Sequence, residues 1–130
     1  MNRDEIREKT MQLIFQMDVA DEFDFEKLTP IEENVKIIGK KQAIATLTAI
    51  RDHIKDIDII LSNNLDKWSL DRVAKTDLAI LRNATAEMLY VEEIPNKVAI
   101  NEAINLAKKY GDEKSYAFIN SVLSKVERSI

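Results

Sequence analysis

The chain has 130 residues, of which 45% are apolar and 32% charged, and this size suits a single domain with its own core. Its formal net charge of −4 excludes a strongly basic nucleic-acid binder, so any RNA or DNA contact needs a local cationic patch or a partner. The sequence contains no cysteine, no signal peptide and no apolar stretch long enough to cross a membrane, and we therefore expect a cytoplasmic protein.

The first predicted helix covers residues 2–20. Asn2 can cap its amino end, and Glu5 three residues later completes the pattern of a capping box. An apolar stripe at helical spacing indicates the face that packs on the core, made of Ile6, Thr10, Leu13 and Met17. By charge pattern alone the opposite face of the first turns is typical of a solvated, ion-paired surface, formed by Arg3, Asp4, Glu5, Arg7, Glu8 and Lys9.

The acidic connector at residues 21–29 carries three large apolar side chains that we expect to pack on the core, Phe23, Phe25 and Leu28. Thr29-Pro30 followed by two glutamates predicts the start of a helix. A helical pattern continues from there to about residue 54, and Gly39 marks a possible break or kink. Residues 55–67 are interpreted as a separate helix, although neither glycine nor proline marks the joint.

Residues 68–72 are expected to form a turn, with room for one short helix, at the seam between two halves of the fold. The following helix, residues 75–92, is apolar on nearly all sides, which is typical of a central position. Its charged residues Arg82 and Glu87 must find partners or extend to solvent, and Glu102 is a candidate partner for Arg82.

Residues 94–110 predict an amphipathic helix that starts after Pro95 and stops at Gly111, a residue that tolerates positive φ. Its small alanines let other helices approach closely, and we interpret it as the helix around which its neighbours pack. The last helix begins at a cap supplied by Asp112 or Ser115. Because no segment alternates as a strand would, we predict an all-α domain of about six or seven helices.

The sequence offers little that resembles a catalytic or metal centre. His53 is the one histidine and has no evident catalytic partner, so we interpret it as a surface residue. Asp56 and Asp58 are two residues apart on a helix and do not share a face. Two glycines in total cannot build the usual phosphate-binding loop. We therefore expect no catalytic residue, no metal and no cofactor.

One surface of the last helix has the composition of an RNA contact, because Lys114, Phe118, Ser121 and Lys125 fall on a common flank. An aromatic ring beside lysines can stack on a base while the cations meet phosphate. The alternative is a phenylalanine at the edge of the core that is covered by a lysine stem.

Taken together, stretches along the whole chain resemble the NusB family of transcription antitermination factors. The matching residues include Arg7-Glu8, Gln12-Leu13 and Phe15-Gln16, then Trp68, Arg72, Leu81-Arg82, Glu87 and Ile94-Pro95, then Val98 to Ala103, Leu106 to Lys108, Tyr110-Gly111, Phe118 to Asn120 and Val122-Leu123. The resemblance is most specific from 78 to 123, where the order and the spacing of the motifs agree.

The resemblance implies one NusB-like domain over residues 1–130, with an N-terminal bundle at 1–67 packed on a C-terminal bundle at 68–130. It also implies binding of boxA-type RNA from ribosomal operon leaders together with NusE, a small-subunit ribosomal protein, within a complex on RNA polymerase. RNA contacts are implied for Arg3, Arg7, Trp68, Lys114 and Phe118. Contacts with NusE are implied for Phe15 and Asp77. Relatives occur as monomers and as homodimers.

An alternative stays open, in which the chain is a helical protein-binding module with little RNA affinity of its own. The carboxylates Asp4, Glu5 and Glu8 interrupt the basic run that the family often has at this end, which favours the alternative. Lys114 stands where some relatives have an acid, which favours phosphate binding instead.

Overall fold

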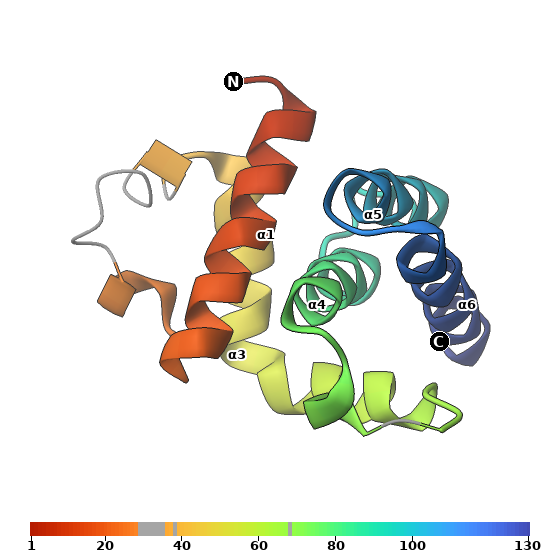
Figure 1. Ribbon diagram of the computed structural model, residues 1–130. Helices are drawn as coiled ribbons and strands as arrows, with labels where there is room; N and C mark the ends of the chain where they lie inside the picture. The colour runs from red at the N-terminus through yellow and green to blue at the C-terminus, as the bar shows by residue number, and fades with distance from the viewer. Residues whose placement is uncertain (29–35, 38, 68) are drawn as a thin grey trace.

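The computed structural model describes residues 1–28, 36–37, 39–67 and 69–130. Within these ranges the chain is all-α, as predicted, and contains no strand (Figure 1). Its elements are α1 (Arg3–Ala20), η1 (Phe25–Leu28), α3 (Lys41–Asn63), η2 (Leu70–Arg72), α4 (Lys75–Tyr90), α5 (Asn96–Tyr110) and α6 (Glu113–Ser129), where η denotes a 3-10 helix. The predicted helix start at Thr29-Pro30 lies outside the described residues, so the total of six or seven helices is not tested.

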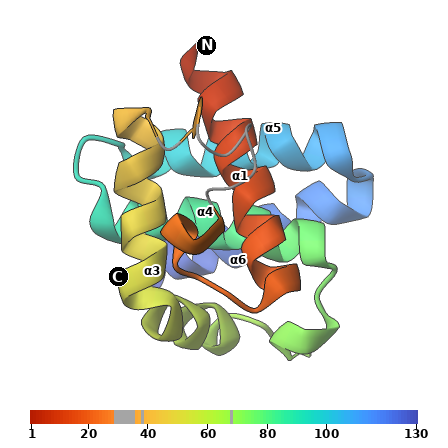
Figure 2. The same ribbon diagram turned by 90° about the vertical axis from the view of Figure 1, so that its left-hand side faces the viewer.

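Helix α4 is the centre of the molecule. It packs against α1 and α3 on one side and against α5 and α6 on the other (Figure 1), and all ten residues from Leu78 to Glu87 are buried. Figure 2 shows α1 crossing in front of α4 and α5. The prediction that residues 94–110 form the organising helix is therefore wrong. That helix, α5, keeps an exposed polar face that includes Asn101 and Asn105, whereas α4 is covered all round.

Helix α4 packs on helices from both halves of the chain, so its contacts do not separate two bundles. The division at 1–67 and 68–130 stays a prediction. The apolar residues of the connector lie as expected, with Phe25 buried and with Phe23 and Leu28 packed against the core. Among the described helices, none is both long and apolar enough to cross a membrane.

The helix ends follow their caps closely. The Asn2 side chain accepts a hydrogen bond of 2.8 Å from the Glu5 amide at the start of α1. At the start of α6, Asp112 rather than Ser115 is the cap, since its carboxylate accepts from the Ser115 amide at 3.0 Å. Gly111 ends α5 as predicted, but for a different reason: its φ is −130°, in the extended region. A Cβ at Gly111 would lie 2.6 Å from the Ser115 side chain, so glycine permits this close approach.

The two interruptions predicted between residues 30 and 67 are both present, one before the long helix α3 and one within it. It begins at Lys41, directly after a turn at Gly39, and it is kinked at His53, where φ is −129° and ψ is 19°. The kink lies next to the joint expected at residue 54. The imidazole of His53 stacks on the Tyr90 ring at the end of α4, with centroids 4.0 Å apart and planes 5° apart. His53 is therefore half-buried against an aromatic ring, whereas we expected a surface residue.

The predicted pairing of Arg82 with Glu102 is also wrong. The Arg82 guanidinium donates to both carboxylate oxygens of Asp58 on α3, at 3.0 and 2.9 Å, and lies 3.4 Å from Asp18 on α1. Arg82 and Glu87 are five residues apart, so their side chains leave α4 about 140° apart. Arg82 consequently faces the α1–α3 side, while Glu87 faces the amino end of α1 and binds Arg7.

Candidate nucleic-acid interface

A hollow of about 230 Å³ lies between η2 and the first turns of α4 and α6. We call it the Phe118 hollow, and it is lined by Arg72, Val73, Ala74, Asp77, Lys114, Ser115 and Phe118. Phe118 is partly buried and packs against the core, which matches the half-exposed position expected for it. Lys114 and Asp77, predicted for two different partners, therefore lie on one surface.

The electrostatics of the Phe118 hollow are set by two cations and one carboxylate. Lys114 and Arg72 are exposed, and neither makes an ion pair among the described residues. Asp77 is half-buried, and its carboxylate accepts a long hydrogen bond of 3.5 Å from the Ser115 hydroxyl. Burial raises the pKa of Asp77, and the charge of Asp112 adds to the rise. The hollow thus joins an aromatic wall to exposed positive charge.

The flank predicted on α6 is only partly available. Lys125 donates to Asp66 at 2.6 Å, so its charge is already compensated. Ser121 is exposed but does not line the Phe118 hollow. Of the four residues on this flank, Lys114 and Phe118 are the two that remain together at the hollow.

A second hollow, of about 270 Å³, lies between the amino end of α1 and α5. We call it the Arg7 hollow, and it is lined by Asn2, Asp4, Glu5, Arg7, Glu8, Glu102, Asn105, Leu106 and Lys109. Four carboxylates face two cations here, and both cations are paired. This surface therefore carries excess negative charge, which disfavours phosphate.

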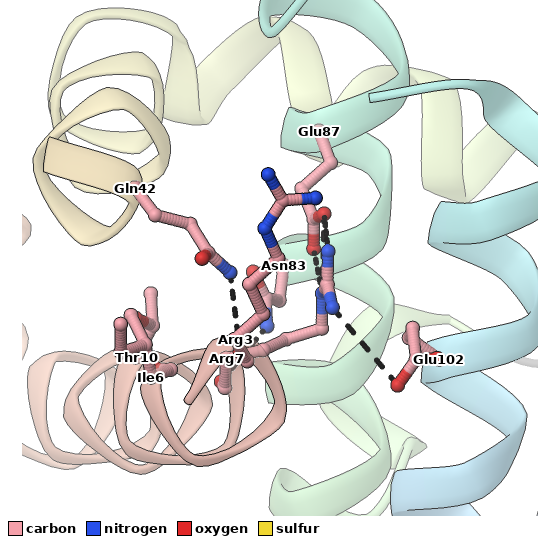
Figure 3. A network of polar contacts seen from close by, with 8 residues as sticks. All are labelled: Arg3, Ile6, Arg7, Thr10, Gln42, Asn83, Glu87 and Glu102. Carbon is pink, nitrogen blue, oxygen red and sulfur yellow. Dashed lines mark hydrogen bonds and ion pairs between the residues drawn. The ribbon is translucent and has the colours of Figure 1, made fainter. Parts of the chain in front are cut away.

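Arg7 is buried in this second hollow rather than presented to solvent. Its guanidinium donates to Glu87 on α4, with the Nε–Oε1 distance 3.1 Å and the Nη2–Oε2 distance 2.9 Å, and it lies 3.9 Å from Glu102 on α5 (Figure 3). Burial alone would lower the pKa of Arg7, but the hydrogen bonds and charges of these carboxylates outweigh that effect, and the pKa is raised. The guanidinium joins three helices, and only its Nη1 edge, 3.9 Å from Glu102, makes no hydrogen bond among the described residues, so the RNA contact implied for Arg7 stays a prediction.

The other cation of the Arg7 hollow, Lys109, is paired with Glu8 at 2.5 Å. The Tyr110 hydroxyl donates to the same carboxylate at 2.6 Å and accepts from the Gln12 amide at 2.8 Å. The bonds from Lys109 and Tyr110 hold the pKa of Glu8 below its ordinary value. These contacts tie α1 to the end of α5 and leave little free positive charge on this side.

Of the remaining predicted site residues, Arg3 and Phe15 are not among the described residues that line either hollow. Arg3 is exposed at the start of α1, and its carbonyl accepts a hydrogen bond of 3.3 Å from Gln42. Phe15 is partly buried and packs against the core, which leaves part of its ring for a partner. Trp68 lies outside the described residues.

Sequence reasoning missed Arg72 as a site residue. The motif resemblance included this arginine without giving it a role. It stands 42 positions before Lys114, in a short 3-10 helix, so no helical spacing could bring the two together. Only the packing of α4 against α6 brings both to one hollow.

Comparison with known proteins then decides the family. The NusB family model matches residues 4–128, which is nearly the whole chain. The chain belongs to the NusB family. A transcription antitermination protein NusB from Geobacillus kaustophilus is 42% identical, over 100% of this chain and 98% of the relative. One from Finegoldia magna is 44% identical, over 97% of this chain and 93% of the relative. These relatives are antitermination factors and not enzymes, in agreement with the prediction.

Solved NusB structures share the fold. NusB from T. maritima superposes with a TM-score of 0.83 at 32% identity, and the match covers 98% of this chain and 92% of that one. A chain of the structure titled "Crystal Structure of Antitermination Factors NusB and NusE in complex with dsRNA" superposes with a TM-score of 0.75 at 25% identity, covering 98% and 97%. That relative was therefore captured together with NusE and with double-stranded RNA.

Proposed function

We propose that this NusB-family chain binds boxA-type single-stranded leader RNA together with NusE and joins an RNA polymerase complex on ribosomal RNA operons, in the cytoplasm. The observation that carries the RNA part is the Phe118 hollow, where a partly buried ring lies beside Lys114, a cation without a carboxylate partner among the described residues. Family membership, and a relative captured with NusE and double-stranded RNA, support NusE and RNA as the classes of partner.

The mechanism is recognition without bond chemistry. In single-stranded RNA the bases can be splayed out, so one base stacks on the exposed part of the Phe118 ring while Lys114 meets a neighbouring phosphate. Asp77, at the edge of the same hollow, and Phe15 on α1 would contact NusE. RNA and protein partner would then meet on adjacent surfaces, and each would help to hold the other.

The charge distribution limits how much RNA affinity this chain can supply alone. Arg7 and Lys109 are compensated by carboxylates, so few cations remain for phosphate. Because each phosphate contact contributes about −0.7 to −0.9 to the slope of log affinity against log salt, we expect a slope on the order of −2 to −4. NusE is therefore expected to contribute much of the affinity of the assembly.

The test is the substitution Phe118→Ala, measured by titrating fluorescently labelled boxA-type RNA in the presence of NusE. Loss of one base stack should weaken binding by about 1–3 kcal/mol. Tyr116→Ala is the matched control, because Tyr116 is also partly buried on α6 and packs against the core, but does not line the hollow. Equal affinities of the two variants for RNA would make Phe118 a packing residue only.

The alternative, a protein-binding module with little RNA affinity, is favoured by one observation, the excess of carboxylates in the Arg7 hollow. The two functions separate when boxA-type RNA and a scrambled RNA of equal composition are titrated with and without NusE. If the chain prefers boxA-type RNA in neither condition, the RNA function fails and the protein-binding module remains.

A further inference from the structure

Arg72 holds a fixed position at the rim of the Phe118 hollow. It is the last residue of η2, where its amide donates to the Ser69 carbonyl at 3.0 Å, and the next amide, that of Val73, donates to the Leu70 carbonyl at 3.1 Å. Val73 is buried in the core, which anchors the segment, while the Arg72 side chain is exposed. The backbone therefore presents the guanidinium from a different element than the one that carries Lys114.

No carboxylate among the described residues forms an ion pair with Arg72, although Asp77 lines the same hollow and the charges of Arg72 and Asp71 attract each other. Asp71 accepts a hydrogen bond from the Ser69 hydroxyl, which lowers the pKa of Asp71, and Asp112 caps α6. Arg7, Arg51 and Arg82 all form ion pairs, whereas Arg72 forms none among the described residues. Its charge is thus available to an anion at the hollow, next to an aromatic wall that suits a base.

We propose that Arg72 binds the phosphate of the nucleotide whose base stacks on Phe118, so that the RNA strand crosses the hollow from α6 to η2. This inference rests on the proposed function and assigns that site a second phosphate-binding residue. A guanidinium presents a fork of donors that matches two phosphate oxygens, while Lys114 acts as a point charge on the neighbouring phosphate. Two cations from separate elements would fix the path of the strand, which a single lysine cannot do.

The experiment compares Arg72→Gln, Arg72→Lys and the matched control Lys75→Gln. Lys75 is an exposed cation three residues along, but it lies 3.2 Å from Asp18 and does not line the hollow. Labelled boxA-type and scrambled RNA are titrated with the NusE complex over a series of potassium chloride concentrations. Arg72→Gln should make the salt slope shallower by about 1 and weaken both RNAs equally, as expected for a lost phosphate contact. Arg72→Lys should keep the wild-type slope.

The outcomes separate this inference from the function on which it rests. If the wild-type complex prefers boxA-type RNA and Phe118→Ala weakens it, but Arg72→Gln has the same salt slope as Lys75→Gln, the role of Arg72 is wrong and the function stands. If the wild-type complex has no preference for boxA-type RNA, both are wrong. Thermal melting of each variant checks the fold, and because the Arg72 side chain is exposed we expect the melting temperature to stay close to that of the wild type.

Discussion

The two hollows of this protein have similar volumes, about 230 and 270 Å³, but opposite electrostatics. In the Arg7 hollow both cations are bound by carboxylates of the same surface, and the one arginine is buried. In the Phe118 hollow both cations are exposed and unpaired among the described residues. A basic residue at the expected position is therefore not enough for an RNA contact, because availability depends on which carboxylates the fold brings to it.

The pairing of Arg7 in its hollow predicts that this residue stabilises the fold. Substituting it should therefore give the largest change in the free energy of unfolding. Arg7→Ala would leave Glu87 buried without its partner, and removing one member of a buried ion pair costs about 3–5 kcal/mol. Chemical denaturation should detect this loss. Arg3→Ala, an exposed arginine one turn earlier, is the control and should stay within about 0.5 kcal/mol. Equal stability of the two variants would mean that the Arg7–Glu87 pair does not hold α1 to α4.

A charge reversal in the Arg7 hollow should make its electrostatic charge more like that of the Phe118 hollow. Asp4→Lys adds a cation at the exposed rim of that hollow, so RNA affinity should rise and the salt slope should steepen by about 1 if a phosphate comes within reach. Glu92→Lys makes the same change in net charge at an exposed position outside both hollows. An identical gain in the two variants would show that the RNA does not reach the Arg7 hollow and that only the net charge changed.

The smallest expected effect concerns Asp77, the one carboxylate lining the Phe118 hollow. Because burial raises its pKa, Asp77 takes up a proton at a higher pH than an ordinary aspartate, and neutralising it removes repulsion of phosphate. RNA affinity should therefore rise as the pH is lowered, starting at a higher pH than an ordinary aspartate would give. Measured without NusE, which Asp77 is proposed to contact, Asp77→Asn should bind RNA more tightly at neutral pH and lose most of this pH dependence. His53, the one histidine, stacks on Tyr90 outside the hollow. It is present in the wild type and in Asp77→Asn alike, so it cannot cause a difference between their pH profiles.

Much of the fold was predictable because its signals are local. The caps Asn2 and Asp112, the turn at Gly39 and the stop at Gly111 each act within a few residues, and the predicted limits of α1, α4 and α5 agree with the structure within two residues. The apolar pattern of residues 75–92 correctly predicted a central helix, but the organising role was given to α5, because its start signal, apolar face and stop signal all agreed.

The charges of the candidate site could not be predicted in the same way. The ion pair of Arg7 with Glu87 joins residues 80 positions apart, and that of Lys125 with Asp66 joins residues 59 positions apart. No spacing rule reaches across such distances, since the pairing depends on how α1 packs on α4 and on how α6 lies beside the segment that follows α3. Sequence motifs indicated which cations to consider, and the structure separates those that are compensated from those that are exposed.

The most direct test is NMR chemical-shift mapping of the protein, in complex with NusE, as boxA-type RNA is added. The account predicts that the RNA-dependent shifts cluster at the Phe118 hollow, in Arg72, Val73 and the first turns of α6, while the amides around Arg7 and Asn105 stay unchanged. Shifts concentrated at the Arg7 hollow, with Phe118 and its neighbours unaffected, would contradict it.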